Sequence, residues 1–264
     1  KIESIVDHNH QKAAYCGIHY FDSDAYPAEF REKLYMGNIH GNCINADALS
    51  RNGSTYRGKG LPDFLKANDA WFMPVVQKTG PDGCLYILDW YDRYHCYQDA
   101  NRDPAGIDRL KGRLYRVRYK DTPRVKPFDL AKESDDQLIE RLGSPNVYYR
   151  DIAQRLLAER GVPETLAKLE SLATDRKANR KARLHALWAR VGAPAVPPKF
   201  VADLFKDEDP AFRAWALRAA GNHAKSVGDA GNRLLALAAN DPSPDVRLQA
   251  VIAAPKIVGK NADA

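Results

Sequence analysis

The 264-residue chain lacks any long apolar run, and this absence excludes several classes of protein. No stretch approaches the about 18 uninterrupted apolar residues of a transmembrane helix, so no membrane span is predicted. The first residues, KIESIVDHNHQK, contain no apolar segment of the kind that a signal peptide requires. The chain also begins without methionine, and we therefore expect a mature or excised piece of a larger protein.

Cysteine is scarce, and its spacing excludes two common cofactor sites. The four cysteines are Cys16, Cys43, Cys84 and Cys96, and no two of them are spaced as CxxC. A zinc ribbon and a covalently attached haem are therefore not predicted. Cys84 lies in an apolar run and is expected to be a buried thiol. Cys43 and Cys96 lie beside polar loop residues and would form a disulfide only in an oxidising compartment.

A concentrated positive charge is also missing. The net charge is +6, but lysine and arginine are interspersed with acidic residues along the predicted helices. No nucleic-acid reader motif is present, so no nucleic-acid partner is predicted. With 44% hydrophobic and 28% charged residues, the composition is that of an ordinary globular chain.

The composition changes near residue 125, and this change predicts two parts. Cysteine, most of the tyrosine, and many glycines and asparagines precede it, whereas alanine, leucine and arginine at helical spacing follow it. The segment 121–129, DTPRVKPFD, contains two prolines and is typical of a linker. We therefore predict a β domain over residues 1–122 and an α-helical domain over residues 123–264.

The first part has the pattern of an antiparallel β fold. Two short apolar runs within 34–49 flank Gly41-Asn42, and residues 112–119 alternate as expected for a half-buried strand. The run CLYILDW, 84–90, is apolar throughout and predicts a strand buried on both faces. Before it, Pro81-Asp82-Gly83 predicts a turn in which proline presets one dihedral angle and glycine accepts a positive φ. Short strands with glycine-rich turns favour a sandwich, barrel or propeller.

The second part contains a helical repeat. Four segments, 144–161, 179–192, 209–223 and 241–257, can be aligned, and helices over 135–142, 162–174, 198–207 and 230–240 alternate with them. Each aligned segment has an arginine at the same place; these are Arg150, Arg183, Arg213 and Arg247. A period of this length predicts an α-solenoid of about four helix pairs. The arginines would either bind backbone carbonyls and aspartates or form a basic stripe, and the recurring Trp188 and Trp215 are expected in the core.

Specific motifs resemble known families in both parts. The motif D-P-x-V/F-R-x-x-A of the second part resembles HEAT repeats of the short, phycobilisome-lyase-like kind. Three stretches of the first part are similar to the last blades of quinoprotein sugar dehydrogenases, the glucose/sorbosone dehydrogenase superfamily, and above all to planctomycete-type membrane-bound dehydrogenase-like proteins. They are CGIHYFDSDAYPAEFREKLYMGNIHGNCINADAL (16–49), DFLKANDAWFMPVVQKTGPDGCLYILDWYD (63–92) and GRLYRV (112–117).

The resemblance implies a partial β-propeller of antiparallel blades followed by an all-α HEAT-like solenoid. Only roughly two blades fit into residues 1–122, and a propeller must close on itself to protect its strand edges. It therefore implies that missing N-terminal blades of the same protein are a partner of this chain. It also implies a periplasmic or extracellular location.

In such dehydrogenases, pyrroloquinoline quinone and calcium occupy the propeller mouth, and a cytochrome c accepts the electrons. The catalytic histidine belongs to an earlier blade, so catalytic residues of this chain are unknown. His40 lies about where the family has a cofactor-binding lysine, and Met73 lies about where an arginine is common. Both departures remove positive charge that would offset the quinone carboxylates. His40 and Asn42 are the predicted cofactor-binding residues.

Polar residues at the predicted blade ends form the remaining candidate site. The set comprises His19, Asp22, Asp24, His40, Asn42, Asp89, Asp92, His95 and Asp99. Within it, His19, Asp92 and His95 are the predicted metal ligands, because histidine and aspartate bind cations or act as acid–base groups. The alternative for each residue is a structural one, since Asp and Asn are favoured in turns for their own backbone hydrogen bonds.

Two functions follow from these observations. The chain is either a piece of a secreted quinoprotein-dehydrogenase-like propeller that oxidises a sugar or another alcohol, or a non-catalytic propeller that binds a ligand. In the second case the HEAT region is a scaffold for a protein partner.

Overall fold

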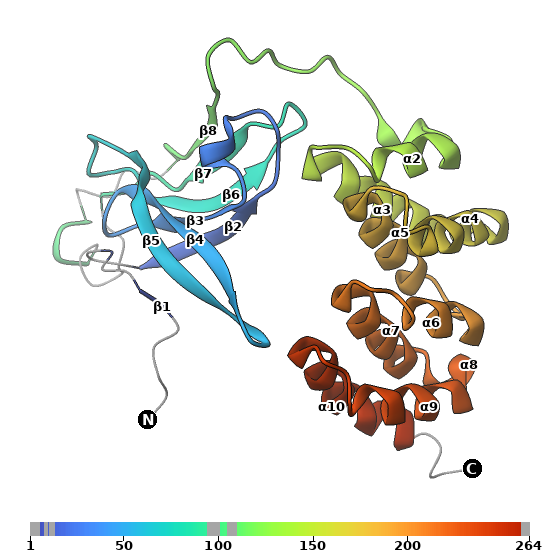
Figure 1. Cartoon of the computed structure of the whole chain (residues 1–264). Helices are drawn as coiled ribbons and strands as arrows, with labels where there is room; N and C mark the ends of the chain where they lie inside the picture. Colours follow the sequence, from blue (N-terminus) through green and yellow to red (C-terminus); the bar gives the residue numbers. More distant parts are fainter. Residues whose placement is uncertain (1–5, 8–9, 11–13, 94–100, 105–109, 260–264) are drawn as a thin grey trace. The chain divides into compact units, whose positions relative to one another are not determined.

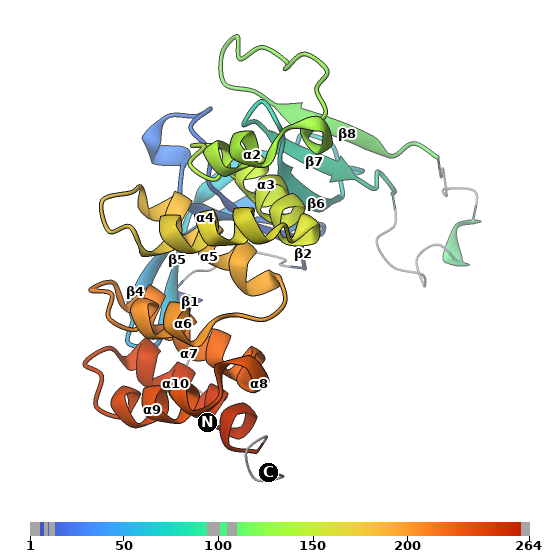
Figure 2. The ribbon, with the colours of Figure 1, turned by 90° about the vertical axis from the view of Figure 1, so that its right-hand side faces the viewer.

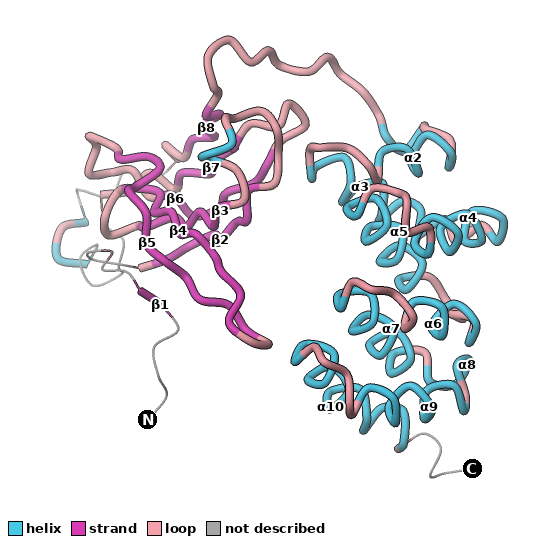
Figure 3. Tube along the Cα trace, viewed as in Figure 1, coloured by secondary structure: helices cyan, strands magenta, loops and turns pink. Residues whose placement is uncertain are grey.

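The computed structural model describes residues 6–7, 10, 14–93, 101–104 and 110–259. Strands occupy the first part and helices the second, as Figure 3 shows by colour. The chain divides into two compact units. The first comprises Lys1–Asn52, Tyr56–Lys126 and Pro145–Tyr148, and the second Gly53–Thr55, Pro127–Ser144 and Tyr149–Ala264. The predicted order, antiparallel β structure followed by helices, is confirmed.

The first unit contains two sheets (Figure 1). One has the order β1-β5-β4-β3-β2, in which β2 to β5 form an antiparallel meander and the short β1 pairs parallel to β5. Its strands are β1 (Val6–Asp7), β2 (Tyr15–Phe21), β3 (Lys33–Asn38), β4 (Cys43–Asn52) and β5 (Thr55–Lys66). The other is the antiparallel meander β6 (Pro74–Thr79), β7 (Leu85–Asp89) and β8 (Arg113–Val117).

The turn between β6 and β7 forms as predicted. The amide of Gly83 donates to the carbonyl of Gly80 at 2.9 Å, and Gly83 has a φ of 76°. Asp82 reinforces the turn, since its carboxylate accepts from the amide of Cys84 at 3.1 Å. A side chain at Gly83 would collide with Ser23, so glycine is required for space as well as for its φ.

The prediction that 84–90 is buried on both faces is wrong. Leu85 and Ile87 are fully buried, but Leu88 is 49% and Trp90 is 62% exposed. The register pairs Leu88 with Val76 of β6 and with Leu114 of β8, so an apolar row crosses the exposed face of the sheet. An apolar run carries no period-two signal, and the sequence therefore could not show which face is covered.

The core of the first unit lies between the two sheets. It contains Phe21, Tyr26, Tyr35, Ile44, Ala46, Phe72, Cys84, Leu85 and Ile87. Strand β6 packs closely against β2 and β3 because both offer glycine at the contact. A Cβ atom on Gly37 would lie 2.3 Å from the carbonyl oxygen of Pro74, and one on Gly17 would lie 2.6 Å from that of Val75.

The second unit is built of helices that stack in layers in chain order (Figure 2). Their bounds are α2 (Asp135–Arg141), α3 (Val147–Arg160), α4 (Pro163–Thr174), α5 (Arg180–Gly192), α6 (Pro198–Leu204), α7 (Pro210–Asn222), α8 (Ala224–Val227), α9 (Asp229–Ala238) and α10 (Pro244–Val258). Ser134 and Gln137 form a capping box at α2, and Asn179 and Asp209 cap α5 and α7. No helix in the described parts of the chain is both long and apolar enough to cross a membrane.

Three of the recurring arginines, Arg150, Arg183 and Arg213, connect successive layers, and Arg247 binds the loop before its own helix. Arg213 donates to both carboxylate oxygens of Asp241, at 2.8 and 2.9 Å, and to the carbonyls of Asp207 and Glu208. Arg183 pairs with Asp207, and Arg247 donates to the carbonyls of Asp241 and Pro242. Arg150 completes the series, since its guanidinium donates to the carbonyl of Ser144 and to His185 Nε2.

These contacts favour the structural interpretation of the arginines over a basic stripe. Trp188 and Trp215 differ from expectation, because both are only partly buried and lie against each other with ring centroids 5.9 Å apart.

Candidate functional site

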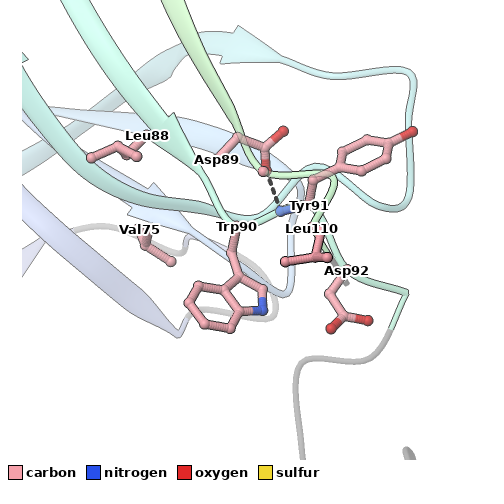
Figure 4. A pocket seen from close by; sticks show the side chains of 8 residues that line it. Val75, Leu88, Asp89, Trp90, Tyr91, Asp92 and Leu110 are labelled. Atoms are coloured by element: carbon pink, nitrogen blue, oxygen red, sulfur yellow. Dashed lines mark hydrogen bonds between the residues drawn. The ribbon is translucent and has the colours of Figure 1, made fainter. Parts of the chain in front are cut away.

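A pocket of about 330 Å³ lies where β7 ends and β8 begins (Figure 4). It is lined by Val75, Leu88, Asp89, Trp90, Tyr91, Asp92, Leu110 and Gly112. The meander topology produces this site, because the segments that follow β7 and precede β8 meet at one end of the sheet. Most of the lining is apolar or aromatic, and Trp90 and Leu110 are highly exposed.

Asp89 organises the backbone around this pocket. Asp89 is 1% exposed, and its Oδ1 accepts from the amides of Met73 and Tyr91 at 2.7 and 2.9 Å. The second bond holds Tyr91 at a φ of 52°, a conformation that costs a residue with a Cβ atom about 1 kcal/mol or more. Oδ2 is buried and has no hydrogen-bond partner of normal geometry among the described residues.

A cluster of aromatic rings and one cation stands beside Asp89. The guanidinium of Arg113 lies 3.4 Å from the ring centroid of Tyr91, and Trp71 contacts the same ring at 5.5 Å. Burial, and then the charge of Asp89, raises the pKa of Tyr115, which packs against Phe72. Tyr115 therefore stays protonated at physiological pH. Figure 4 shows the ring of Trp90 pointing to the other side of the chain from Tyr91, towards Leu110.

The predicted cofactor-binding residues lie in the turn between β3 and β4. His40 is exposed, whereas Asn42 is partly buried and has a φ of 51°. The side-chain amide of Asn42 donates to the carbonyls of Ala70 and Phe72, at 3.1 and 2.8 Å. Asn42 thus positions the segment before β6, whose Met73 amide is bound by Asp89. The turn is connected to the pocket through that segment.

His19 lies elsewhere. Its Nε2 is 2.8 Å from the hydroxyl of Thr79, and burial, followed by the nearby charge of Lys78, lowers its pKa to about 4. The imidazole is therefore neutral at physiological pH. Thr79 is four residues along β6 from Val75, which lines the pocket, and this is about 13 Å at roughly 3.3 Å per residue. His19 and Asp92 are not brought together.

The predicted metal set of His19, Asp92 and His95 remains a prediction, because His95 lies outside the described residues. Within the described ranges, no group of three or more His, Cys, Asp or Glu side chains is arranged to hold a metal ion. Asp92 is 8% exposed and borders the pocket. Cys96 also falls outside the description, and Cys43 has a free thiol.

A second polar cluster lies on the first sheet, and it was not predicted from the sequence. Asn45 of β4 accepts from Asn38 and donates to Asp63, at 2.9 and 2.6 Å, while Asp47 is 2.8 Å from Nε2 of His10. The available signal was the alternation in CINAD, 43–47, where Ile44 and Ala46 enter the core and the polar residues take the other face. Burial, then Asp63, raises the pKa of the Cys43 thiol, which disfavours the nucleophilic thiolate.

The chain thus combines a β unit that bears an aromatic pocket with a unit of stacked helices. Residues 1–121 match a family model described as "Domain of unknown function (DUF7133)", and the helices lie beyond this match. No curated protein and no solved structure matches the chain.

Proposed function

We propose that this chain is the C-terminal part of a dehydrogenase-like β-propeller protein of the glucose/sorbosone type, followed by a HEAT-like solenoid, and that it binds a ligand without catalysis. In this proposal the parent protein is periplasmic or extracellular, and upstream blades complete the propeller. The pocket after β7 takes the ligand, and the helices are a scaffold for a protein partner.

The packing of the two sheets supports the propeller. Strands β2 to β5 and β6 to β8 each form an antiparallel meander, and the two sheets lie face to face with β6 against β2 and β3, as neighbouring blades do. The exposed row of Val76, Leu88 and Leu114 supports an additional covering element, because contiguous apolar side chains on a sheet face commonly mark an interaction site.

The composition of the pocket is the observation that favours binding over catalysis. Trp90 offers a broad exposed ring beside apolar Leu88 and Leu110, and such a ring suits the face of a sugar or polyol. The carboxylate of Asp89 is occupied with backbone amides on one oxygen. Met73, where the resemblance places an arginine, is 6% exposed and brings no charge.

One observation favours the dehydrogenase alternative. Arg113 is a cation held over Tyr91 next to Gly112 of the pocket, and a guanidinium there could offset a carboxylate of a quinone. In that alternative the parent oxidises a sugar or another alcohol with pyrroloquinoline quinone and calcium, and a cytochrome c accepts the electrons.

Two titrations distinguish these functions, both followed by tryptophan fluorescence and calorimetry. For a binding module we expect saturable binding of a monosaccharide such as glucose, weakened at least tenfold in Trp90→Ala. The matched control is Tyr56→Ala, because Tyr56 is an exposed aromatic residue on β5. Saturable binding of pyrroloquinoline quinone with calcium that Arg113→Gln abolishes would instead support the dehydrogenase. No sugar binding by the wild-type chain would contradict the proposed ligand.

A further inference from the structure

A groove of about 170 Å³ lies on the helical unit between α7 and α10, two helices that pack side by side. It is lined by Arg218, Gly221, Gln249, Ile252, Ala253 and Lys256. Its floor is formed by small residues, because a Cβ atom on Gly221 would lie only 3.3 Å from that of Ala253. At the rim, Ile252 is 50% exposed. The groove therefore combines an apolar floor with a partly polar rim.

The charge of this groove is positive and not compensated. Neither Arg218 nor Lys256 forms an ion pair with any residue in the described ranges, and the six lining residues include no acid. Lys256 donates to the side chain of Asn222 at 3.1 Å, which leaves its charge intact. The guanidinium of Arg218 lies 4.7 Å from the ring centroid of Trp215, and this contact orients it.

Trp215, which contacts Arg218 of the groove, belongs to a row of aromatic rings. Trp215 of α7 contacts Trp188 of α5, which in turn meets the imidazole of His185 edge-on at 4.8 Å. The indole nitrogen of Trp188 is buried and has no acceptor among the described residues. Partly exposed tryptophan beside arginine is the composition that concentrates binding energy at protein interfaces.

The pattern of cations disfavours a nucleic acid as the occupant. Phosphate backbones are bound by rows of lysine and arginine, and affinity grows with the number of phosphates that are neutralised. The row of arginines on these helices is already engaged with carbonyls and aspartates, as described for Arg213 and Arg183. Two cations next to an apolar floor fit a single carboxylate followed by an aliphatic side chain.

We propose that the groove between α7 and α10 binds an acidic segment of a partner protein. A carboxylate of the segment is bound by Arg218 and Lys256, and a neighbouring aliphatic side chain packs on Ile252 and Ala253. The guanidinium can bind a carboxylate through two parallel hydrogen bonds, which fixes the direction of the segment. This inference rests on the proposed scaffold role of the helices and names the chemistry of the partner.

The test uses a fluorescein-labelled octapeptide of alternating glutamate and leucine, with the glutamine–leucine peptide as its neutral counterpart. Fluorescence anisotropy should show saturable binding of the acidic peptide alone, together with a change in tryptophan emission. Arg218→Gln and Lys256→Gln should each weaken binding at least fivefold, and Ile252→Glu should abolish it. Lys225→Gln on α8 makes the same charge change at an exposed site and should alter affinity less than twofold.

Thermal unfolding establishes that each variant is folded, and these exposed substitutions should leave the melting temperature within about 2 °C of wild type. Equal losses of peptide affinity in Arg218→Gln and Lys225→Gln would show that only the net charge matters, and this would overturn the proposal. Peptide binding that is unchanged in Arg218→Gln but lost in Trp90→Ala would place the binding site on the β unit and overturn the proposal. An oligothymidylate that binds through Arg218, while the acidic peptide does not, would overturn the choice of partner. Absence of any peptide binding would overturn the proposal that the groove binds an acidic segment. Sugar binding would still test the pocket of the β unit separately.

Discussion

Replacing Arg213 by alanine is expected to destabilise the helical unit substantially. The change removes two charge-assisted bonds to Asp241 and two bonds to the carbonyls of Asp207 and Glu208. The side chains of Arg213 and Asp241 are only 14% and 6% exposed, so the orphaned carboxylate stays largely buried. Asp241 retains the amide of Ser243 as a donor at 2.8 Å, which limits the loss.

The magnitude follows from these contacts. Hydrogen bonds to charged groups contribute about 1.5–3 kcal/mol, and removing one partner of a buried pair costs about 3–5 kcal/mol. Because water reaches the edge of this pair, we expect about 2–3 kcal/mol. In a unit of this size, each kcal/mol shifts the melting temperature by about 3–4 °C, so Arg213→Ala should lower it by about 6–12 °C.

The pH dependence provides a second, independent check. The hydrogen bond from Arg213 lowers the pKa of Asp241 below its unfolded value of about 3.9. A carboxyl group with a lowered folded-state pKa contributes stability that is fully present above that unfolded value. The contribution is lost as the pH falls through the folded-state pKa. The difference between wild type and Arg213→Ala should therefore be constant from pH 7 to 5 and shrink below pH 4.

The assay is thermal unfolding followed by circular dichroism at pH 7, 5 and 3. Arg233→Ala is the matched control, since Arg233 is an exposed arginine of α9 and should shift the melting temperature by no more than about 2 °C. Affinity for the acidic peptide should change less than twofold in Arg213→Ala. A shift no larger than that of Arg233→Ala, or a shift at pH 3 equal to that at pH 7, would refute this structural role of the recurring arginines.

Three further predictions concern the β unit. Gly37→Ala should lower the free energy of unfolding in urea by about 2–3 kcal/mol, because its Cβ atom would collide with the Pro74 carbonyl oxygen. Gly143→Ala in the helical unit is the control, because a Cβ atom fits there without moving packed elements apart. Because the pKa of His19 is lowered in the folded state, the unfolded chain is protonated at a higher pH than the folded chain. Stability should therefore decline as the pH falls from about 6.5 to 4, and His19→Gln should reduce this decline. Asp89→Ala should release Tyr91 from its positive φ and weaken sugar binding at least fivefold, and unchanged calorimetric affinity would contradict the organising role of that carboxylate.

Helix positions could be predicted because their signals are local. The aligned segments 179–192 and 209–223 enclose α5 and α7, and Asn179 and Asp209 cap them through bonds to amides two or three residues ahead. The turn of Pro81, Asp82 and Gly83 formed for the same reason. Residues in these motifs find their partners within a few positions of the chain, so composition and spacing suffice.

The candidate site was predictable only in part. Asp92 was identified as a polar residue after a strand, and it does border the pocket, but His19 was grouped with it although β6 separates them. Arg113 and Tyr115 were not recognised as neighbours of the site. A strand residue can be assigned to a site only once its neighbouring strand in the sheet is known. The apolar run of β7 gave no indication that Leu88 would be exposed.

By itself, the sequence determined the change from strands to helices, the turns, the caps and the recurrence of arginine. It determined them because each depends on dihedral preference, periodicity or a hydrogen bond over a few residues. Only the tertiary structure decided that Asp89 binds the amide of Met73 ahead of the neighbouring strand, that Arg183 and Arg213 bind aspartates of the next layer, and that Arg218 and Lys256 share a groove. Those relations join residues about 16 to 40 positions apart, and they arise when apolar surfaces pack, which no local preference specifies.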